Sequence, residues 1–291
     1  MMTPHLSMFW GNRDASEWYY VSQFPAKFAH QNLDILLIGD SRAKSAWIPD
    51  KNKKNYNLAI GGATPIEGLI TLEQLIANKI KFKHLVISYS PSHLVGEDSY
   101  WRRTVNFQYI NFFRHLRLRI VADKLGDTGY FRKDKTYLSH ALLGSKGDQI
   151  SFSLDGTRRR LGLLNLELIE KNQGHSFYGR ADSAPGLPEE FLKPLEFNLS
   201  PLADQQLQQI LYLAKREKIK IHWAYTPYSS KACPRLPKMY IHKYVSYINS
   251  LGINQLNQFG CAPDEMFGDS SHLYKGALVY SQMLNQILEK L

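Results

Sequence analysis

The chain has 291 residues, of which 44% are hydrophobic and 21% charged, a composition that excludes a wholly disordered or low-complexity protein. Its two cysteines, Cys233 and Cys261, are too few for a disulfide framework, a four-cysteine zinc site or an iron–sulfur cluster. The net charge of +10 favours anionic partners such as nucleic acid, anionic lipid or acidic polymers, unless it serves only solubility.

The length fits one large α/β domain, or one such domain with an insertion. No run of 18 apolar residues is present, which argues against a transmembrane helix within the chain. The segment from Met1 to Asp14 lacks the apolar core of a signal peptide. We expect a membrane anchor to precede residues 1–32, which we interpret as an N-terminal helical segment.

The first half of the chain alternates between predicted helices and strands. A helix over 12–31 begins at Asp14 or Ser16 and is bent at Pro25. Further elements are expected at strands 33–38, 56–60 and 84–88, and at a helix from Pro65 to about Lys79 with Thr64 and Glu67 as its capping box.

Residues 97–200 differ in character and are interpreted as an insertion. It begins with a helix over 104–125 and continues in short, Gly-rich and charged pieces. Order returns with a helix over 203–217, a strand over 220–225 and helices over 238–251 and 274–288.

This alternation predicts a parallel sheet covered by helices on both faces. The predicted core is formed by residues 33–96 and 201–291. Ligands of such sheets bind at the carboxyl ends of the strands. Polar, turn-forming residues follow four of these strands, at 39–41, 61–62, 90–93 and 226–228.

Ser41 directly follows the strand 33–38, where a helix is expected to begin. A serine in this place is exposed at the sheet edge, and N–H groups of the helix start point toward it. That geometry suits a nucleophile whose developing oxyanion needs donors. In the simpler interpretation, Asp40 or Ser41 only caps the helix.

Asp269 and His272 provide the complementary groups near the C-terminus, in the loop before the last helix. A histidine three residues after an aspartate can direct one ring nitrogen at a serine while the aspartate holds the other. These residues supply the three roles of a Ser-His-Asp triad. The alternative is a surface histidine and a capping aspartate.

Taken together, Gly39-Asp40-Ser41, Gly61-Gly62 and Asp269-x-x-His272 resemble the SGNH (GDSL-like) hydrolase superfamily over about half of the chain. The resemblance implies a flavodoxin-like three-layer α/β/α fold. It implies Ser41 as nucleophile, His272 as general base and Asp269 as the residue that orients it. It also implies an oxyanion hole formed by the N–H groups of Ser41 and of Gly61 or Gly62.

One segment departs from that pattern. The superfamily usually has Gly-x-Asn-Asp after the third strand, whereas this chain has Ser90-Pro91-Ser92-His93, with the shorter Ser92 where the oxyanion-binding Asn belongs. This segment and the C-terminal motif resemble DltD-type proteins, which act in D-alanylation of cell-wall polymers. Related SGNH-like proteins add or remove acyl groups on surface polysaccharides, usually outside the cytoplasm.

Four further residues are weaker candidates for substrate binding. Arg42 either contacts an anionic group or lies solvated at the helix start, and we favour the latter. His93 is close to the inferred site by motif position. Trp101 and Arg102 could contact sugar rings and anionic groups, although packing and surface roles are more common for such residues.

Other site classes find no support in the sequence. The histidines lack metal-ligand spacing, and neither a Walker loop nor Gly-x-Gly-x-x-Gly is present, so we expect no metal and no nucleotide cofactor. Signatures of nucleic-acid-binding folds are missing too, which leaves only charge in favour of that function.

We therefore predict serine-dependent acyl transfer, in particular O-acetylation, on a cell-surface or secreted polysaccharide. The alternatives are an SGNH-type esterase or deacetylase, and a non-catalytic DltD-like binding or assembly protein. The expected partners are an acyl donor, a carbohydrate acceptor and a membrane-bound protein that supplies the acyl group. Contact with the membrane is expected only through an anchor or the basic surface. The expected location is extracytoplasmic, with a cytoplasmic location left open, as are the oligomeric state and the pairing of Cys233 with Cys261.

Overall fold

The computed structural model describes residues 13–95, 100–127, 131, 137, 156–178, 196–269 and 271–291. The side chains of residues 13, 14, 102 and 156–159 lie outside that description, and with them the predicted capping role of Asp14 and the predicted contacts of Arg102. In the described parts, no helix is both long and apolar enough to cross a membrane.

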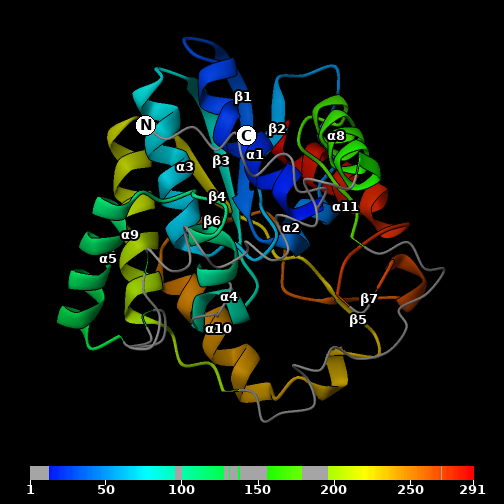
Figure 1. The fold of residues 1–291 in the computed structure, drawn as a ribbon. Helices are drawn as coiled ribbons and strands as arrows, with labels where there is room; N and C mark the ends of the chain where they lie inside the picture. The colour runs from blue at the N-terminus through cyan, green and yellow to red at the C-terminus, as the bar shows by residue number, and fades with distance from the viewer. Residues whose placement is uncertain are drawn as a thin grey trace.

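A five-stranded parallel sheet forms the centre of the molecule (Figure 1). The strand order is β2-β1-β3-β4-β6. The strands are β1 (Asn32–Gly39), β2 (Asn55–Asn57), β3 (Lys81–Ser88), β4 (Lys220–Trp223) and β6 (Asn254–Gln255). This is the doubly wound, flavodoxin-like order, with the chain reversing its direction of travel beside β1. The predicted fold class is confirmed.

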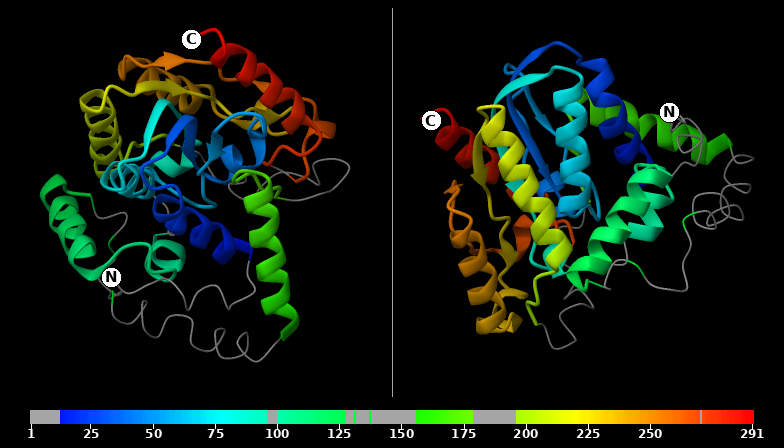
Figure 2. Two further views of the ribbon diagram at one scale, coloured as in Figure 1. Left: turned by 90° about the horizontal axis from the view of Figure 1, so that it is seen from above. Right: turned by 90° about the vertical axis from the view of Figure 1, so that its left-hand side faces the viewer.

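Helices cover both faces of this sheet (Figure 2). The α-helices are α1 (Arg13–Lys27), α2 (Ser41–Ala46), α3 (Pro65–Ala77), α4 (Ser92–Val95), α5 (Phe112–Leu125), α8 (Gly156–Lys171), α9 (Pro201–Arg216), α10 (Lys238–Ser250) and α11 (Gly276–Leu288). Short 3-10 helices are η4 (Cys233–Arg235) and η5 (Asp264–Met266). The described residues form two hydrophobic cores. One joins the sheet to α1, α3, α9 and α10, and the other joins it to α2 and α11.

The capping box of α3 is formed as predicted. Thr64 accepts a hydrogen bond from Ile66 N, and Glu67 accepts from Thr64 N. The Glu67 carboxylate is fully buried beneath the insertion and also accepts a hydrogen bond from the Thr104 hydroxyl. Burial raises the pKa of Glu67, against the effect of these hydrogen bonds.

The helix predicted over 104–125 is wrong in its first part. The chain instead forms a π-helical turn, η2 (Tyr100–Val105), and starts α5 afresh at Phe112. Gln108 has a φ of 53°, which a continuous helix cannot contain. The Asn111 side chain then accepts a hydrogen bond from Arg114 N and caps the new helix.

The two α-helices described within the predicted insertion, α5 and α8, lie against the core. Helix α5 contacts α9, and α8 lies along α1 (Figure 2). Ser16 of α1 donates a hydrogen bond to the Gly162 carbonyl of α8 at 2.9 Å. The division of the chain into insertion and core remains a prediction.

A second, two-stranded parallel sheet pairs β5 (Tyr228–Ser229) with β7 (Cys261–Ala262). Cys233 and Cys261 form a disulfide next to it. The structure thus provides the pairing that the sequence left open, and fastens the segment after β4 to the one after β6.

Candidate active site

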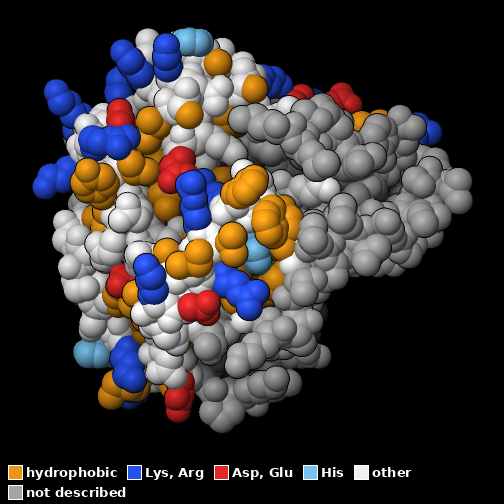
Figure 3. Space-filling view, turned by 60° about the vertical axis from the view of Figure 1, so that its left-hand side comes forward, with side chains coloured by type: hydrophobic (Ala, Val, Ile, Leu, Met, Phe, Trp, Pro, Cys, Tyr) orange, Lys and Arg blue, Asp and Glu red, His pale blue; other side chains and the backbone are white. Residues whose placement is uncertain are grey.

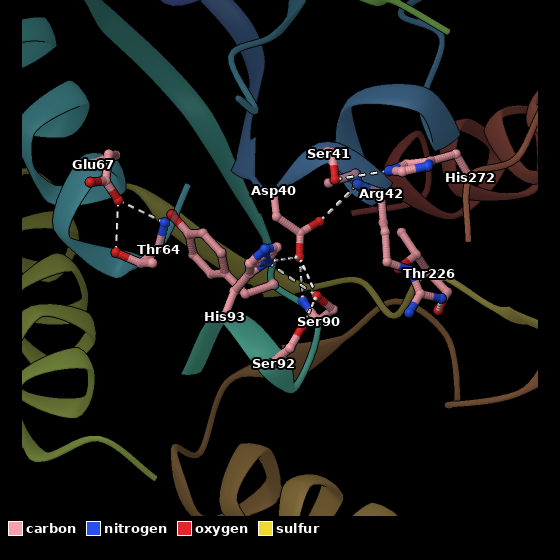
Figure 4. A network of polar contacts seen from close by, with 12 residues as sticks. Asp40, Ser41, Arg42, Thr64, Glu67, Ser90, Ser92, His93, Thr226 and His272 are labelled. Carbon is pink, nitrogen blue, oxygen red and sulfur yellow. Dashed lines mark hydrogen bonds and ion pairs between the residues drawn. The ribbon is translucent and has the colours of Figure 1, made fainter. Parts of the chain in front are cut away.

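Ser41 is the first residue of α2 and lies at the carboxyl end of β1 (Figure 4). Gly39 makes this position possible, because a side chain there would place its Cβ 2.1 Å from the Ser88 carbonyl oxygen on β3. The strands therefore approach closely just before the nucleophile candidate.

Asp40 is the N-cap of α2. Its Oδ1 accepts hydrogen bonds from Arg42 N and Ala43 N at 2.9 and 3.3 Å. Its Oδ2 accepts from the N–H and hydroxyl of Ser90, both at 2.6 Å, and lies 3.0 Å from His93 Nδ1 (Figure 4). Burial opposes ionisation, but His93, Ser90 and Arg42 outweigh it and lower the pKa of Asp40. Of the two residues that could cap this helix, Asp40 and Ser41, it is Asp40 that does so.

His272 is directed at Ser41 (Figure 4). Its Nε2 is 2.9 Å from Ser41 Oγ, and its Nδ1 is 2.9 and 2.8 Å from Asp269 Oδ1 and Oδ2. Asp269 Oδ1 also accepts the N–H groups of Ser271 and His272, which fixes the carboxylate in the loop. Despite partial burial, its hydrogen bonds with His272 and these N–H groups lower the pKa of Asp269. The three residues thus have the contacts expected of a triad.

The residues expected to form the oxyanion hole are Ser41, Gly61, Gly62 and Ser92, and their surroundings in the structure differ. Ser41 N–H donates to no group within the described residues. Gly61 N–H donates to Glu17 Oε2 at 3.3 Å. Gly62 has a φ of 74°, and Arg103 Nη1 lies 2.1 Å from where a Cβ would stand. Ser92 Oγ is 3.3 Å from Ser90 Oγ, on the Asp40 side of the site.

Arg42 is buried, so its predicted solvated position is wrong. Its side chain is 6% exposed and donates to the carbonyls of Thr226 and Pro227 at 3.2 and 2.6 Å. The guanidinium carbon also lies 3.5 Å from the centre of the Tyr228 ring. The burial follows from the path of the chain. The loop after β4 runs beside the start of α2, and its carbonyls, which lie beyond the strand and its sheet hydrogen bonds, accept from Arg42 instead.

The weaker candidates fall into different settings. His93 is buried next to Asp40. Trp101 is 2% exposed and packs edge-on against Tyr100 and His115, so it contributes to the core and the packing interpretation is confirmed. Within the described residues, no cluster of His, Cys, Asp or Glu side chains could hold a metal ion.

Two residues at the site were not predicted, Glu17 and Tyr178. The fully buried Glu17 accepts hydrogen bonds from the Gly61 N–H and from the Tyr178 hydroxyl. A signal for Glu17 existed, because it lies four residues before Val21 and so on the apolar face of α1. The position of Tyr178, beyond α8, has no comparable signal in the sequence.

Comparison with known proteins gives a limited result. No family model matches the chain, and neither does any curated protein sequence. Among solved structures, it is similar to one described as a putative acylhydrolase from Bacteroides fragilis NCTC 9343. The sequences are 11% identical, the match covers 92% of this chain and 93% of the other, and the TM-score is 0.42. A likeness this distant carries no information about the chemistry of the site.

Proposed function

We propose that the protein is a serine-dependent enzyme of the SGNH type that transfers or hydrolyses acyl groups. The observation that carries this proposal is the unbroken line of contacts from Ser41 Oγ to His272 and on to Asp269, with distances of 2.8–2.9 Å. It lies at the carboxyl edge of a parallel sheet, where ligands of such folds bind.

In the proposed mechanism, Ser41 Oγ attacks the acyl carbonyl while its proton passes to His272 Nε2. Asp269 accepts the Nδ1 proton in a hydrogen bond and stabilises the imidazolium. The imidazolium then protonates the departing alkoxide, leaving an acyl ester on Ser41. Water or a sugar hydroxyl then attacks the ester as His272 takes its proton, and the His272 imidazolium returns that proton to Ser41 Oγ as the ester bond breaks. The Ser41 N–H is one oxyanion donor, and Gly62 N–H and the Ser92 hydroxyl remain candidates for the second.

The finer proposal is O-acyl transfer, in particular O-acetylation, on a surface polysaccharide outside the cytoplasm. The DltD-like segment at Ser90–His93 and the net charge of +10 support an anionic envelope polymer as acceptor. The Cys233–Cys261 disulfide supports an oxidising compartment. A membrane-bound supplier of acyl groups belongs to this proposal. Hydrolysis, with water as the acceptor, is the close alternative.

A non-catalytic binding or assembly role is favoured by one specific observation. Glu17 accepts the Gly61 N–H, and that N–H is one of the two glycine donors expected for the oxyanion. If neither Gly62 nor Ser92 replaces it, the triad lacks part of the electrostatic stabilisation on which acyl transfer depends.

Covalent labelling tests the proposed function directly. Wild-type protein is incubated with a fluorophosphonate at pH 7–8 and analysed by intact mass and peptide mapping. We expect one adduct on Ser41. The Ser41→Ala variant should form none, and the rate of labelling should fall by several orders of magnitude in His272→Ala. Ser250→Ala, at the exposed end of α10, is the matched control and should label like wild type. Failure of the wild type to label contradicts an enzymatic function.

The acceptor is tested in a second experiment. The labelled-acetyl ester of a small phenol is supplied with and without acetyl-free anionic oligosaccharides. Acetyl transfer to the sugar supports the transferase. Release of acetate alone, unaffected by the sugar, supports the esterase and contradicts the finer proposal.

A further inference from the structure

We propose that Glu17 and Tyr178 are positioning residues for His272, an inference that rests on the proposed function. They connect the His272 ring to helix α1 and to the loop after β2 that contains Gly61. These three parts of the chain share no sequence motif.

The first observation is the contact between Tyr178 and His272. Their rings are stacked, with centroids 4.7 Å apart and planes inclined by 24°. The contacts of His272 with Ser41 and Asp269 involve its two ring nitrogens. Such contacts leave the ring free to tilt about the line through them. A second ring packed on its face restricts that tilt.

The second observation is what holds Tyr178. Its hydroxyl donates to Glu17 Oε2, and the same oxygen accepts the Gly61 N–H at 3.3 Å. A Cβ at Gly61 would lie 2.6 Å from the Tyr178 hydroxyl. One buried carboxylate oxygen therefore fixes both the stacked ring and the loop after β2, and only glycine fits at position 61 without displacing them.

The third observation is the charge behind this ring. Glu17 is fully buried on α1, and Lys44 of α2 is fully buried nearby. Burial lowers the pKa of Lys44 to about 8, while the Glu17 charge works in the opposite direction. Among the described residues, Lys44 Nζ has no hydrogen-bond partner, and it lies 5.5 Å from the Tyr20 ring centre. The Lys44 charge thus offsets that of Glu17 in the interior.

These contacts have a chemical consequence for the reaction. His272 becomes an imidazolium when it takes the Ser41 proton, and a cation over an aromatic face is stabilised by the ring's electrons. The ring of a phenol that donates a hydrogen bond to a carboxylate is richer in electrons than that of a free phenol. Among the described residues, the groups in contact with His272 are Asp269 and Ser271 on its own loop, Ser41 on α2 and Tyr178 after α8. Charged groups on the far side of Tyr178 include Glu17, which accepts a hydrogen bond from its hydroxyl, Lys44, which interacts with Glu17, and Arg103, whose guanidinium lies beside Gly62.

The test compares wild type with Tyr178→Leu, Tyr178→Phe and Glu17→Gln. The rate of Ser41 labelling by the fluorophosphonate is measured from pH 5 to 9. Without the Tyr178 ring, the imidazolium formed in the reaction loses a stabilising contact. We therefore expect the acidic limb of the profile to move about half to one unit toward lower pH in Tyr178→Leu, and less in the other two. The plateau rate should fall severalfold or more.

The matched control is Tyr247→Phe. Tyr247 of α10 also donates its hydroxyl to a carboxylate, Asp204 of α9, at 2.7 Å, but has no contact with the triad. It should leave both limb and plateau unchanged. Thermal melting identifies any variant that fails to fold, and Tyr178→Phe, which keeps the ring, is the mildest of the set.

A second readout separates this inference from the proposed function. The ring protons of His272, assigned with His272→Ala, are titrated by NMR without any reaction. The midpoint should move to lower pH in Tyr178→Leu and stay in Tyr247→Phe. If labelling succeeds but neither midpoint nor limb moves, the positioning role is wrong and the proposed function stands. If the wild type does not label, the proposed function fails, while the NMR midpoint still decides the effect of Tyr178 on His272.

Discussion

At the scale of single residues, the two neighbours of Ser41 are anchored in different directions. Asp40 binds Ser90 at the end of β3, and Arg42 binds the carbonyls of Thr226 and Pro227 after β4. Ser41 lies between these anchors and directs its side chain at His272. The backbone of the nucleophile candidate is therefore held by its two neighbours, and its Oγ contacts the proposed general base.

Arg42 should contribute to stability through these carbonyls. Arg42→Ala leaves two carbonyl oxygens without their donor and removes the cation from the Tyr228 ring, so we expect a loss of about 2–4 kcal/mol in the free energy of unfolding. Arg42→Lys should recover only part of it, because an ammonium lacks the planar fork. Urea denaturation followed by tryptophan fluorescence measures the loss. The exposed Arg235 is the control, and equal effects of Arg42→Ala and Arg235→Ala contradict this prediction.

At the scale of elements, the sequence was informative where one physical signal dominated. The apolar run of β1 and the capping box of α3 are local patterns, and both elements form close to the predicted bounds. The two-residue strand β6, Asn254–Gln255, is polar and too short for any periodicity. The break before α5 depends on the left-handed backbone of Gln108, a conformation that glutamine does not signal.

The candidate site shows the same division. Ser41 was predictable because it follows a recognisable strand end, and Asp269 and His272 because they lie three residues apart in the loop before the last helix. Arg42 was misjudged because its burial is caused by a loop 184 residues away in sequence. Tyr178 meets His272 only through the path of the chain after α8, which no local pattern encodes.

The disulfide between η4 and β7 should stabilise the element pair that it joins. Cys233 and Cys261 are 28 residues apart, and closing a loop of that length in the unfolded chain is worth about 3–4 kcal/mol in the chain-entropy model. We expect a reductant to lower the unfolding free energy by about this amount, measured by urea denaturation. A Cys233→Ala/Cys261→Ala variant should be insensitive to reductant. An unchanged wild-type midpoint after complete reduction contradicts the prediction.

At the scale of the whole molecule, one face shows how positive charge is arranged among the described residues. On the face shown in Figure 3, Lys and Arg side chains are spread among hydrophobic ones rather than gathered in a single stripe. A distributed charge of this kind suits a long, flexible anionic polymer, which can make many weak contacts, better than a small ligand. This agrees with the acceptor in the proposed function.

In the interior, four of the buried histidines, which lie in different parts of the chain, have a lowered pKa. His84 and His222 face each other across β3 and β4, with ring nitrogens 2.9 Å apart. His115 lies in α5, and His175 follows α8. Burial is the main cause that lowers the pKa of each, to about 4 for His115, His175 and His222. The folded protein therefore resists protonation at four places at once.

Stability should consequently fall in mild acid. An unfolded histidine titrates near pH 6.5, so between pH 6.5 and about 4 the unfolded chain binds more protons than the folded one, and acidification favours unfolding. The contribution is fully present above pH 6.5. Each imidazole that is protonated only on unfolding adds about 1.4 kcal/mol per pH unit to the slope.

Unfolding free energies measured by urea between pH 5 and 7 test this prediction, because carboxylates of the unfolded chain remain ionised there. His175→Gln, whose amide can still donate to the Ser45 carbonyl that His175 contacts, should reduce the slope by about one proton. His242→Gln on the exposed side of α10 should leave it unchanged. The comparison with His175→Gln is decisive because the raised pKa of the buried Glu67 acts in the opposite direction in both proteins. Equal slopes in wild type and His175→Gln contradict the argument that burial keeps these imidazoles neutral.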